Sequence, residues 1–226
     1  MANALRLAAA LLCVSATLAA QSPSASEEVA RLREAVTIMD DVMKGSDTAI
    51  PDSILKRAEA IAVFPSTVKA GFIFGGMRGR GVLSGRTEKG WSPPAFLTLT
   101  GGSVGAQIGG TEIDLILVIM NQSGVEHLLS NQVKLGAEMS AAAGPIGRAG
   151  EASTDVQMQA QILSYSRSRG LFAGIAVNGS VIKEDSDANT RFYGTTLSSE
   201  DIVFERAGVS PASVGALKTA LGRHSN

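Results

Sequence analysis

The sequence contains little of what metal, redox or nucleic-acid chemistry needs. Its single cysteine, Cys13, cannot form a disulfide within the chain. Its two histidines, His127 and His224, stand far apart and have no cysteine or histidine at ligand spacing, so a zinc site has no support. Aromatic residues make up only 4% of the chain, and no basic run is interleaved with them. We therefore expect no metal, no cofactor and no nucleic-acid partner.

An excess of charge of one sign is also missing. The 20 basic residues are balanced by 21 acidic ones, so no global field attracts the protein to a polyanion. Any anion-binding site must therefore be local.

The first 20 residues have the pattern of a secretory signal peptide. Arg6 precedes an apolar run over 7–20 that contains no charged residue. These 14 residues, at roughly 1.5 Å each, are too few to cross a hydrocarbon core of about 30 Å. We expect cleavage after Ala19 or Ala20 and an exported protein, periplasmic or secreted, with an uncleaved N-terminal anchor as the alternative. Cys13 lies in this run, so the mature domain would carry no thiol.

Helical patterns occur towards both ends of the chain. Residues 24–27 read Ser-Ala-Ser-Glu, a capping box, and apolar residues then recur at three- and four-residue steps until about Gly45. A second short helix is expected over 50–60. Near the C-terminus, Ser198 can cap one helix, and the Ser-Pro pair at 210–211 opens another.

The middle of the chain is rich in glycine and reads as strands. Residues 71–110 hold 12 of the 25 glycines, and each interior glycine costs a helix roughly 1 kcal/mol. Strands with bulges tolerate this density. Apolar runs mark the expected strands at 61–64, 71–76, 81–85, 95–100, 114–120, 161–166 and 171–177. The last two flank a turn sequence and predict a hairpin.

These patterns predict an α+β fold, in which a glycine-rich, largely antiparallel β-sheet or partly closed barrel is flanked by N- and C-terminal helices. A single domain would follow the signal peptide over 21–226. We divide it into a helical arm (24–60), a β-rich core (61–195) and C-terminal helices (196–226).

Four motifs suggest chemistry or membrane insertion but are incomplete. The glycines of 75–81 lack the Gly-Lys-Ser/Thr and the helix of a phosphate loop. The glycine zipper of 101–110 is interrupted by polar residues, which favours a strand over a membrane helix. Residues 185–190 alternate oxygen ligands as in a calcium loop, but Thr190 and Thr196 replace its glycine and glutamate, which favours a solvated hairpin turn. Ser103 lies in a Gly-x-Ser-x-Gly pattern, but glycines follow where a nucleophile elbow needs a helix. We expect no enzyme and keep a Ser103 hydrolase as a third hypothesis.

A local basic group lies in and beside the glycine-rich strands: Lys69, Arg78, Arg80 and Arg86. Glycine lets an anionic surface approach the backbone closely, and arginine binds phosphate oxygens through two N–H groups at once. We expect Lys69, Arg78 and Arg80 to contact a phospholipid headgroup at a membrane surface. The alternative is that they are ordinary outward-facing strand residues.

Taken together, many ordered segments resemble the SYLF family, also called Ysc84-like, and indicate a bacterial exported member. The segments are 50–51, 58–65, 68–72, 79–83, 91–95, 105–109, 135–138, 143–148, 164–174 and 193–194. The resemblance covers roughly 27–205 and implies a lipid-binding domain, because family members associate with phosphoinositide-containing membranes. Its fungal branch also binds and bundles actin. Lys69 falls in the family's lysine-alanine-glycine motif and Arg80 in the glycine-x-glycine after it.

The sequence departs from the family pattern in two ways. Its N-terminal helix is acidic rather than lysine-rich, so we expect this helix to bind anionic bilayers poorly. Asn178 replaces the family's glutamate before glycine-serine. Export would also separate the protein from actin, so actin is not an expected partner.

Two main hypotheses follow. The first is an exported, non-enzymatic domain that binds phospholipid headgroups. The second is a structural or assembly protein of the bacterial envelope, whose glycine-rich strands pair with a protein partner or with a second copy in a homo-oligomer.

Overall fold

The computed structural model describes residues 25–44, 50–71, 74–104, 109–130, 132–147, 159–168, 171–206, 208 and 211–225. The predicted signal peptide and the serine that would cap the first helix lie outside these residues. The helices of the described part are α1 (Ala25–Met43), α2 (Asp52–Arg57), α3 (Gln122–Leu129), α5 (Ser186–Tyr193), α6 (Ser199–Val203) and α7 (Gly215–Ser225), the last preceded by a 3-10 turn (Ala212–Val214).

A 10-stranded sheet forms the centre of the described chain. Its strands are β1 (Ala60–Gly71), β2 (Phe74–Thr87), β3 (Gly90–Trp91), β4 (Ala95–Val104), β5 (Gly109–Ile119), β6 (Gln132–Lys134), β7 (Ala141–Ala143), β8 (Ile162–Ser168), β9 (Leu171–Gly174) and β10 (Ser180–Glu184).

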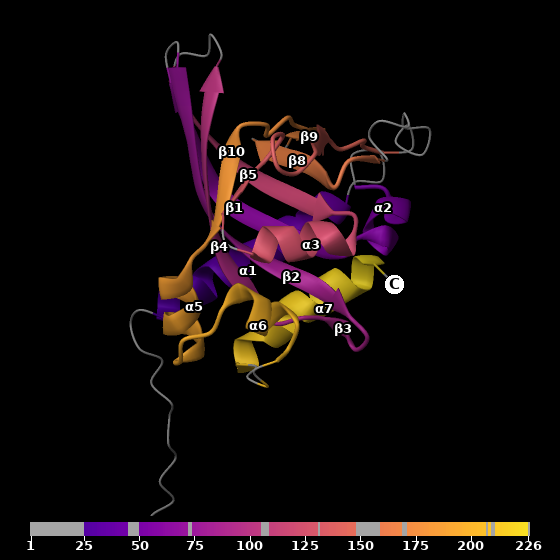
Figure 1. Cartoon of the computed structure of the whole chain (residues 1–226). Coiled ribbons are helices and arrows are strands. Elements are labelled where there is room, and N and C mark those ends of the chain that lie inside the picture. Colours follow the sequence, from indigo (N-terminus) through magenta and orange to yellow (C-terminus); the bar gives the residue numbers. More distant parts are fainter. Residues whose placement is uncertain are drawn as a thin grey trace, which may run out of the picture.

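The sheet is mixed but largely antiparallel, and it curls into an open half-barrel (Figure 1). Its order is β6-β10-β4-β2-β1-β5-β8-β7, with β3 beside β2 and β9 beside β8. Only β7 and β8 pair in parallel among the described strands. The glycine-rich ends of β1, β2, β4 and β5 project beyond the body of the sheet (Figure 1). The predicted α+β class, with helices at both ends of a largely antiparallel sheet, is confirmed.

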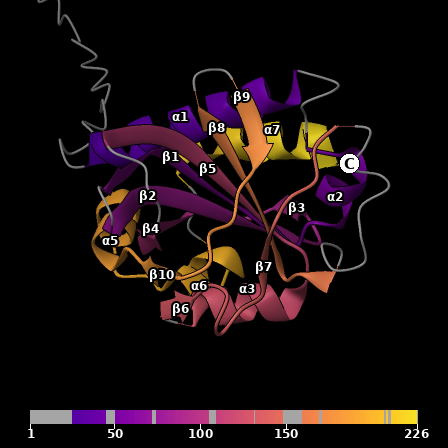
Figure 2. The ribbon, with the colours of Figure 1, turned by 90° about the horizontal axis from the view of Figure 1, so that it is seen from above.

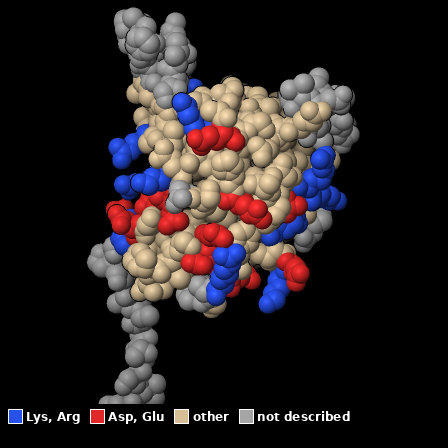
Figure 3. All heavy atoms as spheres, in the orientation of Figure 1, with Lys and Arg blue, Asp and Glu red and all other residues tan. Residues whose placement is uncertain are grey.

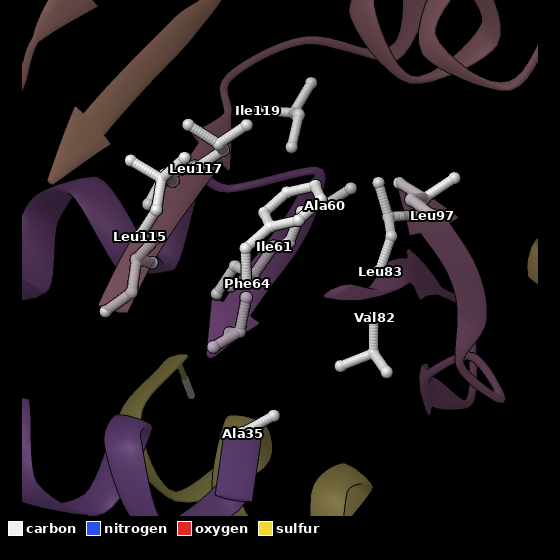
Figure 4. Packing of buried hydrophobic residues seen from close by; sticks show 14 of the residues in the cluster. Ala35, Ala60, Ile61, Phe64, Val82, Leu83, Leu97, Leu115, Leu117 and Ile119 are labelled. Atoms are coloured by element: carbon white, nitrogen blue, oxygen red, sulfur yellow. The ribbon is translucent and has the colours of Figure 1, made fainter. Parts of the chain in front are cut away.

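Helices cover both faces of the sheet. Helices α1 and α7 lie side by side across one face, which we call the α1 face (Figure 2). Val82 of β2 points to this face, towards Ala35 of α1, whereas the next residue, Leu83, points to the opposite side (Figure 4). We call that side the α3 face, because α3 packs on it. Gly124 of α3 lies so close to Ile119 of β5 that an added Cβ would contact the isoleucine side chain. The buried core therefore has two layers, one on each face.

A β-bulge interrupts β1 and sets which way its residues point. Val63 pairs with Val82, but Val68 pairs with Arg78, so β1 contains one residue more than β2 between these pairs. The pairing with β5 shifts over the same stretch. Ser66 lies in the bulge and has a positive φ of 47°, which is uncommon for a residue with a side chain. The inserted residue reverses the alternation of side chains along the rest of β1.

Most elements agree with the sequence, but two expectations are wrong. The strand expected over 71–76 instead includes the end of β1 and the start of β2, since Gly71 pairs with Gly75. The hairpin of β8 and β9 and the Ser198 cap of α6 form as predicted. Residues 185–190, expected to be a hairpin turn, instead begin α5. The Asp185 side chain accepts a hydrogen bond from the Ala188 N–H, and Gly194 ends the helix in the left-handed conformation. The acidic residues that resemble a calcium loop are thus a helix N-cap and first turn.

Candidate anion-binding cleft

A cleft lies between α1 and the middle of β2, on the α1 face. One stripe of α1 forms its first wall, because residues 27, 30, 31 and 34 recur at helical spacing. The bulge residues Pro65 and Ser66 contribute from β1, and Arg78, Gly79 and Arg80 contribute from β2. Three arginines, Arg31 among them, therefore line one space together with two glutamates.

The alternation of glycine and arginine in β2 follows from the different surroundings of its two faces. A Cβ on Gly79 would lie 2.4 Å from Thr67 Oγ1, and a Cβ on Gly81 would lie 2.5 Å from Phe64 Cδ1, so the α3 face has no room for side chains here. Arg78 and Arg80 point to the other face and are exposed. The close approach of β1 on one face thus leaves adjacent arginines on the opposite one.

The strand register separates Lys69 from these arginines. Arg78 pairs with Val68, which shares its face and is 49% exposed. Lys69 pairs with Met77, so it points to the α3 face and is half-buried. The structure therefore brings together two of the three predicted headgroup residues, Arg78 and Arg80, and places Lys69 on the far side of the sheet.

Arg86, the fourth member of the predicted basic group, has a structural role. Its Nε donates to the Ala58 carbonyl at 2.7 Å, and its Nη2 donates to the Leu55 carbonyl at 3.0 Å. Its guanidinium carbon lies 4.9 Å from the centre of the Trp91 ring. Arg86 thus satisfies carbonyls at the end of α2 and is not free to bind a ligand.

Arg31 is the cleft residue that sequence reasoning missed. Its residue is only 9% exposed, and its guanidinium carbon lies 5.5 Å from the centre of the Phe96 ring. Its Nη1 is buried and has no hydrogen-bond partner in the described part of the chain. Burial is the main cause that lowers the pKa of the guanidinium below its ordinary value. The charges of Asp185 and Glu28 oppose this shift, and the charge of Arg80 adds to it. The one available signal was its place in the helical stripe shared with Glu27 and Glu34.

Polar contacts hold α1 in place along the cleft. Near its start, the Glu28 carboxylate is fully buried and lies 2.8 Å from Arg191 Nη2 of α5. Near its end, Asp41 lies 2.8 Å from Arg167 Nη1 of β8. At the bulge, the Ser66 Oγ donates to Glu34 Oε1 at 3.2 Å. The wall that carries Arg31 is therefore fixed at three points.

The other residues considered from the sequence lie on separate elements of the described structure. Ser103 lies within β4, and the next described element is β5 rather than the helix of a nucleophile elbow. His127 lies on α3, and no group of three or more potential metal ligands occurs among the described residues. A search of the same residues finds no helix both long and apolar enough to span a membrane.

Comparison with known proteins gives consistent relatives. Residues 100–224 match the family model Ysc84, described as Las17-binding protein actin regulator. Protein YSC84 of Saccharomyces cerevisiae is 35% identical over 186 residues, which cover 80% of this chain and 40% of that protein. LAS seventeen-binding protein 3 of the same species is 36% identical over 172 residues, covering 74% and 37%. The human SH3 domain-containing YSC84-like protein 1 is 32% identical over 162 residues, covering 71% and 47%. The chain thus spans about two fifths of the length of its yeast relatives.

Proposed function

The chain belongs to the Ysc84 family, and from this premise and the cleft we propose that it is an exported, non-enzymatic domain that binds phospholipid headgroups at a membrane surface. The observation that carries the proposal is the pair Arg78 and Arg80. Both are exposed on one face of β2, and neither forms an ion pair within the described residues.

Half of the eight other arginines in the described structure are held in ion pairs, unlike these two. Arg167, Arg191, Arg206 and Arg223 each form an ion pair with a carboxylate. Residues two apart on a strand are separated by about 6.6 Å along it, so Arg78 and Arg80 can bind oxygens of one phosphate group or of two neighbouring ones. Val68, exposed beside Arg78, offers apolar surface to the acyl region next to a headgroup.

The charge distribution supports specific contacts rather than general attraction. Basic and acidic side chains are interspersed over the face seen in Figure 3, and most of that surface is formed by other residues. With a formal net charge of -1, the protein has little long-range attraction to an anionic bilayer. Affinity would then depend on the cleft.

Co-sedimentation of the purified protein with phospholipid vesicles tests the proposal. We expect the Arg78→Glu/Arg80→Glu variant to lose at least about fivefold in vesicle binding, because it replaces two phosphate contacts by two repulsive charges. The control, Lys89→Glu/Lys134→Glu, makes the same change in net charge at two exposed sites outside the cleft and should bind like the wild type. Equal binding by both variants, or no vesicle binding by the wild type, would contradict the proposal.

Export is the second part of the proposal and rests on the pattern of residues 1–20. Mass spectrometry of the N-terminus of the protein recovered from outside the cytoplasm should find it beginning near Gln21. An intact N-terminus in the cytoplasmic fraction would refute this part and leave headgroup binding unaffected.

A protein partner is the second candidate function, favoured by the relatives and by one edge of the sheet. LAS seventeen-binding protein 3 is named for a protein that it binds. In this chain β9 pairs only with β8 among the described strands, and Leu171 at its start is 77% exposed. An open edge of this kind can accept another strand, from a partner or from a second copy. Cross-linking and native mass spectrometry test it, and a monomer without captured partners would count against it.

A further inference from the structure

The arginine-lined cleft also carries two carboxylates. Glu27 and Glu34 are exposed on the same stripe of α1 as Arg31, about 10 Å apart along the helix axis. Neither forms an ion pair within the described residues, and the Ser66 hydroxyl donates to only one oxygen of Glu34. A ligand in this cleft therefore meets cationic groups and free carboxylate oxygens together.

The buried guanidinium of Arg31 indicates that the cationic side of the cleft lacks an anion. A buried donor without a partner is unfavourable, and more so when it is charged. Nη1 of Arg31 is such a donor. It has no accessible surface, so the guanidinium must turn outward to use it, while the rest of the side chain already lines the cleft. A phosphate oxygen placed between α1 and β2 would supply the missing acceptor.

We propose that the cleft recognises a phosphate ester that carries a primary ammonium group, the chemistry of an ethanolamine phospholipid headgroup. This inference rests on the proposed function and specifies its ligand class. The phosphate is bound by Arg78 and Arg80 with Arg31 behind them, and the ammonium donates hydrogen bonds to Glu27 or Glu34.

The carboxylates are what select this class. A headgroup with a phosphate and no cation, such as glycerol phosphate, gains the arginine contacts but is repelled by Glu27 and Glu34. A choline headgroup has a cation, but its trimethylammonium has no N–H to donate to a carboxylate. A primary ammonium provides both charge and donors, so it satisfies both sides of the cleft.

Vesicle composition combined with removal of the carboxylates tests the inference. Phosphatidylcholine vesicles are doped with equal fractions of either phosphatidylethanolamine or phosphatidylglycerol. We expect the wild type to bind the ethanolamine vesicles about threefold better than the glycerol vesicles, as for one or two exposed charge contacts. The Glu27→Gln/Glu34→Gln variant should reverse this preference, since only the arginines remain charged. The control, Glu88→Gln/Glu126→Gln, removes two exposed carboxylates outside the cleft and should keep it.

The outcomes separate this inference from the proposed function. A wild-type preference for phosphatidylglycerol, or a preference that the Glu27→Gln/Glu34→Gln variant leaves unchanged, overturns the inference while headgroup binding stands. Absence of binding to every vesicle overturns the proposed function. In that case, calorimetry compares the binding of soluble phosphoethanolamine with that of inorganic phosphate in competition, and this comparison decides the cleft chemistry. Tighter binding of phosphoethanolamine, lost in the glutamine variant, supports the inference with a free ligand, and equal binding overturns it.

Discussion

The buried ion pair between α1 and α5 predicts a large and specific loss of stability. Glu28 is fully buried, and its Oε1 accepts hydrogen bonds from Nη2 and Nε of Arg191 at 2.8 and 3.1 Å. Its Oε2 has no partner in the described structure. Arg191→Met would therefore leave a buried carboxylate without its hydrogen-bond donor, with only the nearby Arg31 charge to compensate it. Removing one partner of a buried pair typically costs about 3–5 kcal/mol.

The exposure of Arg191 reduces this figure. Its side chain is 35% exposed, so water entering the space left by the guanidinium would solvate part of the Glu28 charge. We expect Arg191→Met to lower the free energy of unfolding by about 2–3 kcal/mol. In the double variant Glu28→Leu/Arg191→Met neither charge of this pair remains, so its loss should be smaller, about 1 kcal/mol or less.

Urea denaturation of the wild type, both single variants and the double variant measures this as a double-mutant cycle. The reasoning is refuted if Arg191→Met costs less than about 0.5 kcal/mol, or if the double variant is less stable than Arg191→Met alone. Vesicle binding by the same variants gives a second readout, because Glu27 and Arg31 lie on the turn of α1 that this pair holds.

Three further predictions concern single positions. Tyr193→Phe should lower the free energy of unfolding by about 0.5–1.5 kcal/mol, because the Tyr193 hydroxyl donates to the Pro94 carbonyl at 2.7 Å. Tyr165→Phe should be neutral or stabilising, because the buried Tyr165 hydroxyl has no partner in the described structure. Thermal denaturation of both variants compares them. Gly81→Ala should lower the free energy of unfolding by about 1–3 kcal/mol, because the added Cβ overpacks against Phe64. Gly110→Ala, where no atom lies within 4 Å of the added Cβ, is the control. A smaller loss for Gly81→Ala than for Gly110→Ala would contradict the close contact between the strands. Hydrogen bonds from Lys44 and Arg167 lower the pKa of Asp41 below its ordinary 3.8. The stability that the Asp41 carboxylate contributes is therefore present above that pH and lost as the pH falls through the lowered pKa. Asp41→Asn should be less stable than the wild type at pH 7, and the difference should vanish in strong acid.

Local patterns in the sequence were sufficient for the fold class. The three- and four-residue apolar steps before Gly45 indicate a helix rather than a strand, and the glycine density of 71–110 excludes a helix there. Helices and strands could therefore be assigned from periodicity and composition. The hairpin at 161–177 followed from two apolar runs and a turn. The prediction for residues 185–190 was wrong because Asp is common both in turns and at helix N-caps. Long-range contacts, such as the packing of Phe192 against Phe96, favour the helix.

The site depended on long-range pairing that no local pattern contains. Arg31 belongs to an acidic helix in the sequence, and its role becomes visible only when α1 is placed across β2. The sequence could predict that Arg78 and Arg80 share a face, because they are two apart on one strand and side chains alternate along it. It could not predict the face of Lys69, because the direction of that side chain depends on the register of β1 against β2.

The bulge at Ser66 decides that direction and can be tested at two adjacent residues. Phe64 points to the α3 face, as its approach to Gly81 shows. Regular alternation over the next five residues would turn Lys69 to the face of Arg78 and Arg80, and the one inserted residue turns it back and places Val68 there instead. Val68→Glu should therefore put a carboxylate directly beside Arg78 and weaken vesicle binding about as much as Arg78→Glu, while Lys69→Glu, a larger change in net charge, should have little effect. If Lys69→Glu weakens binding as strongly as Val68→Glu, the headgroup does not distinguish the two faces, and the cleft on the α1 face is not its binding site.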